Sequence, residues 1–184
     1  MSFTYFLLLL HTIHLMKKLK RYTIIGIIFV LITGSISHFV YEWSGSSFIL
    51  GFFFPVSEST WEHMKLFFFP MLLYSLFMNA KLKHDFPCIT SSLLSGILLG
   101  TFSIPVIFYT YSGILGRNLT PLDIATFAAS VILSFAAVYK LTTSCKSAPY
   151  TFILKLSVLA VAVCFFVFTC HPPDIGIFAV PLFP

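Results

Sequence analysis

Long apolar runs alternate with short polar stretches along this chain. Five runs are long enough to cross the hydrocarbon core of a bilayer as an α-helix, which takes roughly 20 residues. They cover residues 22–41, about 60–80, 87–115, 121–139 and 150–170. The pattern predicts an all-α membrane protein whose main domain, residues 16–184, is a five-transmembrane-helix bundle.

Composition supports lipid as the solvent for most of the surface. The chain is 58% hydrophobic and only 9% charged, with a mean hydropathy of +0.98. A soluble domain carries about a quarter charged residues. The net charge of +5 comes from short basic clusters between the apolar runs, not from one basic face. We therefore expect the lipid bilayer as partner and no nucleic acid.

The basic residues also predict an orientation. With the N-terminus in the cytoplasm, nine of the 11 Lys and Arg residues fall on the inner side, and only Lys65 and Arg117 fall outside. Cytoplasmic loops carry such an excess. Together with the bacterial character of Met16-Lys17-Lys18-Leu19-Lys20-Arg21, this predicts a multi-pass protein of a bacterial inner membrane, N-terminus in and C-terminus out.

Three segments lie outside the spans. Residues 1–15 are too short an apolar run to cross a bilayer, and we interpret them as a non-native extension or an interfacial helix. Residues 44–55 are too apolar for a free loop and predict an outer lid over the bundle. The Pro-rich tail, residues 171–184, cannot continue a helix and should lie back on the outer surface.

Small residues and cysteines give further expectations. Ser92, Gly96 and Gly100 are spaced four apart, a stripe that lets another helix approach closely. Pro70 and Pro105 fall inside spans. The four cysteines, Cys88, Cys145, Cys164 and Cys170, form no C-x-x-C pair. They predict neither a disulfide framework nor a zinc knuckle.

A polar stretch, residues 55–65, interrupts the apolar pattern before the second span. Ser59 followed by Glu62 has the spacing of a capping box, in which each residue satisfies a free N–H at the helix start. Trp61 would anchor at the interface, and Lys65 would extend outward to water. This structural interpretation accounts for most of the stretch without any activity.

A functional interpretation uses the same residues. The predicted topology collects acidic and histidine side chains at the outer face: the candidate polar cluster is His38, Glu42, Glu58, Glu62, His63 and His171. Five of these, His38, Glu58, Glu62, His63 and His171, form a sufficient ligand set for zinc or another divalent metal. They also suffice for a proton relay. The spacing matches no H-E-x-x-H motif.

The stretch from His38 to Gly45 and the run Pro55-Val56-Ser57-Glu58-Ser59-Thr60-Trp61-Glu62-His63-Met64-Lys65 carry a family resemblance. They resemble an uncharacterised family of small bacterial integral membrane proteins with a P-V-N-E-S-x-W-E-H-x-K signature. Ser57 stands where that signature has asparagine, and both residues can cap a helix. The resemblance implies a multi-pass membrane protein and no established chemistry.

Three functions stay open at this point. The chain could be a non-enzymatic membrane partner or small transport component, acting with a partner protein or as a homo-oligomer. It could be a metal-dependent membrane enzyme that uses the His/Glu cluster, although no G-x-S-x-G or Walker motif is present. It could also be a proton- or cation-coupled carrier.

Overall fold

The structure is a computed structural model that describes residues 3–181, and this range folds into helices and their connections. The long helices are α1 (Phe3–Trp43), α3 (Thr60–Leu82), α4 (Ile89–Leu115), α5 (Thr120–Ser144) and α6 (Thr151–Cys170). Three short elements connect or follow them: α2 (Phe48–Gly51), η1 (Ala148–Tyr150) and η2 (Gly176–Phe178).

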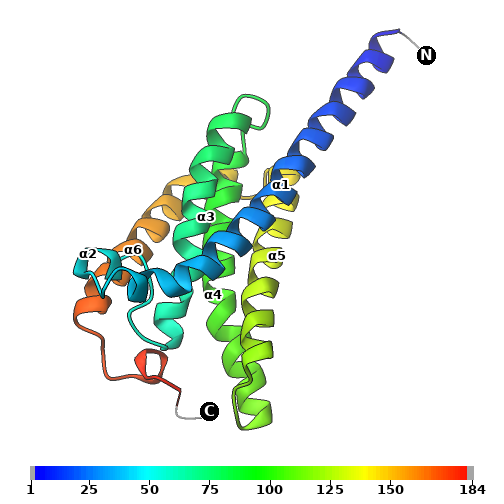
Figure 1. Cartoon of the computed structure of the whole chain (residues 1–184). Coiled ribbons are helices and arrows are strands. Elements are labelled where there is room, and N and C mark those ends of the chain that lie inside the picture. Colours follow the sequence, from blue (N-terminus) through cyan, green and yellow to red (C-terminus); the bar gives the residue numbers. More distant parts are fainter. Residues whose placement is uncertain (1–2, 182–184) are drawn as a thin grey trace.

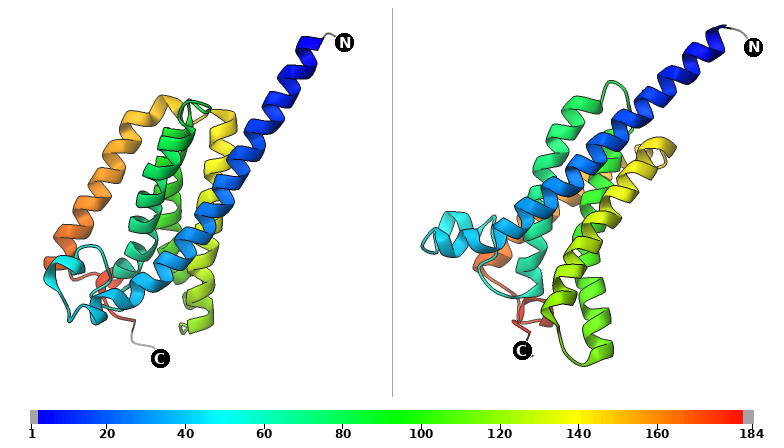
Figure 2. Two further views of the ribbon diagram at one scale, coloured as in Figure 1. Left: turned by 45° about the horizontal axis from the view of Figure 1, so that its top comes forward. Right: turned by 45° about the vertical axis from the view of Figure 1, so that its right-hand side comes forward.

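The long helices run up and down as one bundle (Figure 1). Helix α4 packs against α3, α5 and α6, while α1 crosses over α3 and α5. The α3–α4 connection and the end of α5 lie at one end of the bundle. The segment around α2 and the C-terminal tail lie at the other end (Figure 2). This arrangement defines two ends, which we call the α2 end and the α3–α4 loop end.

Four helical segments are long and apolar enough to cross a membrane: Leu7–Trp43, Ile89–Leu115, Thr120–Ser144 and Ala148–Cys170. Helix α6 illustrates how apolar the surface of these segments is, because Phe152, Ile153 and Leu159 are all exposed on it. Such a surface needs lipid around it. The chain therefore fits a membrane protein.

Helix α3 is not among these four segments, and one side of it lies in the core. Its residues Met64, Phe67, Phe68, Met71 and Met78 are completely buried. Ser59 caps its N-terminus by accepting a hydrogen bond from the Glu62 N–H, as the sequence predicts. The opposite side of α3 carries the exposed residues Leu73, Leu76 and Phe77, so α3 also reaches the surface of the bundle.

The small residues of α4 permit close packing, as predicted. The Ser134 hydroxyl on α5 donates to the Gly96 carbonyl oxygen at 2.8 Å. A Cβ on Gly100 would lie 2.1 Å from the ring of Phe67 on α3. The small-residue stripe therefore serves two helix contacts at once, one with α5 and one with α3.

Helix α1 is unusually long, and its N-terminal part extends beyond the bundle (Figure 1). Its 41 residues correspond to about 60 Å at a rise of roughly 1.5 Å per residue. Lys18 pairs with Asp85 of the α3–α4 connection at 2.6 Å, so the bundle first holds α1 near this point. Residues 3–15 continue the same helix. Their interpretation as a non-native or interfacial extension stays a prediction, and residues 1–2 lie outside the described range.

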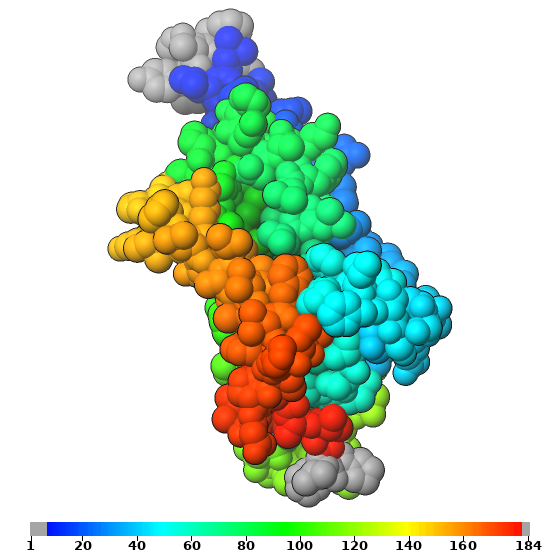
Figure 3. Space-filling model, turned by 90° about the vertical axis from the view of Figure 1, so that its left-hand side faces the viewer, coloured from blue at the N-terminus to red at the C-terminus, as the bar shows by residue number. Residues whose placement is uncertain are grey.

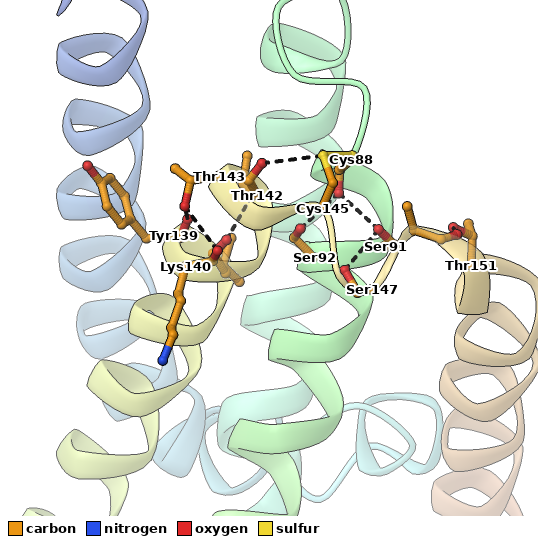
Figure 4. Close-up of a disulfide and its surroundings, with 12 residues drawn as sticks. Cys88, Ser91, Ser92, Tyr139, Lys140, Thr142, Thr143, Cys145, Ser147 and Thr151 are labelled. Atoms are coloured by element: carbon orange, nitrogen blue, oxygen red, sulfur yellow. Dashed lines mark hydrogen bonds between the residues drawn. A yellow bond between two sulfur atoms is a disulfide. The ribbon is translucent and has the colours of Figure 1, made fainter.

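The expectation of no disulfide is wrong. Cys88 and Cys145 form a disulfide across a sequence separation of 57 residues, with their Cα atoms 5.3 Å apart (Figure 4). Cys88 immediately precedes α4 and Cys145 immediately follows α5. Because these two helices are antiparallel neighbours of similar length, the residue before the first lies beside the residue after the second. Cys164 and Cys170 are free.

Candidate metal centre at the α2 end

Three ionisable side chains from three parts of the chain meet at the α2 end. His38 lies near the end of α1, Glu58 in the connection before α3, and His63 in the first turn of α3. One ligand atom from each lies within 4.8 Å of the others. The Glu58 carboxylate oxygen Oε2 is 3.3 Å from His63 Nε2 and 3.7 Å from His38 Nε2. We call these residues the His/Glu triad.

A backbone carbonyl fixes the orientation of the His63 ring. Its Nδ1 atom lies 2.9 Å from the Ser59 carbonyl oxygen. A carbonyl oxygen only accepts, so Nδ1 carries the hydrogen and the Nε2 atom of the neutral ring holds a lone pair. Metal-ligating histidines usually donate their second N–H to a carbonyl or carboxylate in this way. The structure therefore presents Nε2 of His63 to the triad as a ligand atom.

The charges at the triad favour a cation. The lone pair on His63 Nε2 and the negative Glu58 carboxylate repel each other at 3.3 Å unless positive charge lies between them. When Nε2 also carries a proton, His63 donates a hydrogen bond to Glu58, and this bond lowers the pKa of the Glu58 carboxyl below its usual value, so the carboxyl is ionised at neutral pH. Either a proton on His63 or a metal ion would satisfy this arrangement.

The site opens to solvent on one side. The Glu58 side chain is 65% exposed, while those of His38 and His63 are 35% and 29% exposed. A hydrated ion could therefore reach the triad, and Glu58 could move toward it without disturbing the core. Two imidazoles and one carboxylate supply three ligands, which leaves a coordination position for water or a substrate.

A buried ion pair is formed by Glu62, the residue before His63, and Lys65. Lys65 is completely buried, and its Nζ donates to Glu62 Oε2 at 2.7 Å, to Gly51 O at 3.0 Å and to Thr169 Oγ1 at 2.6 Å. The prediction that Lys65 extends outward is wrong. Its three donors find three acceptors inside the protein, which makes burial of the ammonium tolerable.

This ion pair joins three elements. Gly51 ends α2, Thr169 lies near the end of α6, and Lys65 belongs to α3. Glu62 also accepts a hydrogen bond from the Val56 N–H at 3.0 Å. The capping box is thus only half formed, because the Glu62 carboxylate bonds to Val56 and Lys65 instead of Ser59. The same contacts fix both ends of residues 51–56, the segment that leads into Glu58.

Aromatic side chains complete this end of the bundle. Trp61 packs against Phe165 of α6 and Phe178 of η2, with ring centroids 4.9 Å apart in both pairs. Phe53 packs against Phe69 and Phe166. In the space-filling view, α6, the segment around α2 and the tail adjoin on one face (Figure 3). The connection before α3 is therefore held by apolar contacts as well as by Lys65.

The structure leaves three members of the predicted cluster out of the triad. Glu62 turns inward to Lys65. Glu42 and His171 are exposed at the ends of α1 and α6. Glu58 and Glu62 also share no helix face, because α3 begins only at Thr60. The role of Ser59 as the acceptor for His63 was not anticipated. The four-residue spacing between Ser59 and His63 is the signal that could have indicated it.

Comparison with known proteins places this chain in a family but supplies no activity. Residues 11–182 match the model of a family of unknown function, DUF6512, and the chain belongs to that family. No curated protein matches the chain. No solved structure matches it either. The function must therefore be argued from the geometry at the α2 end.

Proposed function

We propose that this protein is a multi-pass membrane protein that binds a divalent transition-metal ion, of which zinc is the best fit, at His38, Glu58 and His63. The observation that carries the proposal is the hydrogen bond between His63 Nδ1 and the Ser59 carbonyl oxygen. It leaves Nε2 free and aimed at the other two ligands. Imidazole and carboxylate together suit zinc and related ions.

In this proposal the protein spans the inner membrane of a bacterium five times, with α3 as the fifth span. The N-terminus faces the cytoplasm and the C-terminus the outer side. The basic residues support this orientation, because Lys83 and Lys146 follow α3 and α5 at the α3–α4 loop end. The triad then faces the extracytoplasmic side, residues 44–55 act as a lid over this end, and the connection that follows them carries Glu58.

A metal at this site fits a non-enzymatic membrane partner or small transport component better than it fits an enzyme. The triad is shallow and Glu58 is largely exposed, whereas catalytic metal sites lie in dry, shaped cavities. A carrier that binds a proton at the triad is the second candidate. The direct approach of Glu58 to His63 favours it, because a proton on Nε2 would bridge the two groups.

Metal content of the purified protein tests the proposal. The wild type is stripped with a chelator in detergent, re-equilibrated with Zn²⁺, and analysed by calorimetric titration and elemental analysis. We expect about one tightly held Zn²⁺ per chain, bound with release of protons from the ligands. His38→Gln and His63→Gln should each weaken binding by at least roughly 10–100-fold, the size of effect seen even for groups behind the ligands.

His171→Gln is the matched control. His171 lies at the same end of the bundle but is exposed outside the triad. Its replacement should leave Zn²⁺ binding unchanged. Equal loss in all three variants would mean adventitious binding by surface histidines and would reject the site. If the wild type binds no Zn²⁺ while His63 titrates with a proton shared with Glu58, the carrier hypothesis takes its place.

A further inference from the structure

The disulfide lies at the opposite end of the bundle from the His/Glu triad. Cys88 is the residue before α4, and Cys145 is the residue after α5 (Figure 4). The two residues differ in exposure, because Cys88 is buried and Cys145 is exposed. Serine hydroxyls surround Cys88: Ser91 and Ser92 both donate to its carbonyl oxygen, and Ser147 donates to Ser91.

The surroundings of this disulfide conflict with a purely structural role. The flanking connections carry basic residues such as Lys83 and Lys146. By the charge distribution this end faces the cytoplasm, on the orientation proposed above. Disulfides that exist in the cytosol are usually transient, and they are catalytic or redox-sensing. A bond at this position is therefore expected to open and close.

We propose that Cys88 and Cys145 form a thiol–disulfide exchange site whose substrate is a cytosolic dithiol reductant. A thiolate of the reductant attacks the sulfur of Cys145, the exposed residue of the two. The S–S bond breaks, and its electron pair stays on the sulfur of Cys88. The second thiol of the reductant then attacks the mixed disulfide and releases Cys145. The reductant ends as a disulfide, and the two protein sulfurs end as thiols after taking up the two protons.

The direction of attack follows from the helix ends. Cys88 is the N-cap residue of α4, a helix of 27 residues. The first N–H groups of a helix lack intrahelical acceptors, and the helix dipole is positive at this end. Both effects stabilise a departing thiolate on Cys88. Cys145 stands at the negative C-terminal end of α5, so it is the poorer leaving group and the more accessible target.

Reduction would remove the covalent cross-link at one end of the bundle and leave the noncovalent contacts between α4 and α5 in place. The disulfide joins the start of α4 to the end of α5. Farther along the two helices, the Ser134–Gly96 hydrogen bond and the side chains around it hold them together. Opening the bond therefore removes the covalent link between the α3–α4 and α5–α6 connections, while α4 and α5 stay paired. This makes the site a local redox-responsive link.

Membrane vesicles of opposite orientation test the proposal. A reduced dithiol protein of the thioredoxin class cannot cross a bilayer. It is added to inverted and to right-side-out vesicles that contain the protein, and free thiols are counted by gel shift with a maleimide polymer. In a Cys164→Ala/Cys170→Ala background we expect zero thiols to become two in inverted vesicles only. The wild-type protein should change from two free thiols to four. This second measurement keeps the test valid if the double alanine variant folds poorly.

A second measurement determines which of the two protein sulfurs the reductant attacks. A reductant variant that keeps only its attacking cysteine should be trapped on the wild-type protein as a mixed disulfide. Peptide mass spectrometry should find it on Cys145, and finding it on Cys88 would contradict the proposed direction. Reduction only in right-side-out vesicles, or only after denaturation, would overturn the exchange site. Zn²⁺ binding measured on the same preparations reports on the triad separately.

Discussion

Lys65 and Glu62 form an ion pair of 2.7 Å in which neither side chain is appreciably exposed, with 0% and 5% of their side-chain surfaces accessible. Its two residues lie on either side of His63 in α3, and Lys65 also bonds to α2 and α6. It is therefore the contact that connects the core of the bundle to the segment carrying Glu58. Because a buried charge without a partner is costly, both residues should be sensitive to replacement.

Replacing Lys65 with Met should destabilise the protein strongly. The variant leaves the Glu62 carboxylate buried without its cation, a change that costs about 3–5 kcal/mol. Glu62→Gln should have a similar effect, because it leaves Lys65 unpaired. The free energy of unfolding in mixed micelles measures both variants. The double variant Lys65→Met/Glu62→Gln should recover part of the loss. A double variant as unstable as the sum of the two single ones would contradict the pairing.

Replacing Gly100 with Ala should destabilise the contact between α3 and α4. The added Cβ would lie 2.1 Å from the buried ring of Phe67, so one of the two helices must shift. Overpacking of this kind costs typically about 1–3 kcal/mol. Gly113 lies on the same helix with nothing within 4 Å of a built Cβ, so Gly113→Ala is the control. That control should be neutral or stabilising in the same unfolding measurement, since Ala is the better helix former.

The Lys18–Asp85 pair should make a small, pH-dependent contribution to stability. The Lys18 hydrogen bond lowers the pKa of Asp85 in the folded protein. A lowered folded-state pKa contributes stability above the unfolded-state pKa, and this is lost as the pH falls through the folded-state value. Thermal unfolding should therefore separate the wild type from Asp85→Asn slightly at neutral pH and not in strong acid. High salt should also remove the difference, because the pair is partly exposed.

The proposed orientation can be tested with reporter fusions. A reporter that is active only outside the cytoplasm should be silent when fused after Lys83 and active when fused after Asn118. The first position follows α3, and the second lies between α4 and α5. Activity after Lys83 would show that α3 does not cross, or that the whole orientation is reversed. A fusion after Gly45, between α1 and α2, then distinguishes these two outcomes, because it is active if α3 does not cross and silent if the orientation is reversed.

Much of the candidate site could be predicted from the sequence. The apolar runs are long enough to predict helices, and Ser59 predicts the start of α3 because its hydroxyl satisfies a free N–H there. His38 and His63 were expected at the same end, since one ends a helix and the other begins the next. The sequence could not predict which of the candidate ligands would come together in the triad. Glu62 and His171 looked equivalent to Glu58 until packing gave Glu62 a different partner.

By itself the sequence determined the local features of this protein: the apolar helices, the caps, the small-residue stripe and the placement of polar groups near helix ends. These depend on residues a few positions apart. Only the tertiary structure decided that Lys65 points inward, because its acceptors Gly51 and Thr169 lie 14 and 104 residues away in the chain. It also decided that Cys88 meets Cys145. Both depend on which helices pack as neighbours, a choice made by long-range burial and not by local pattern.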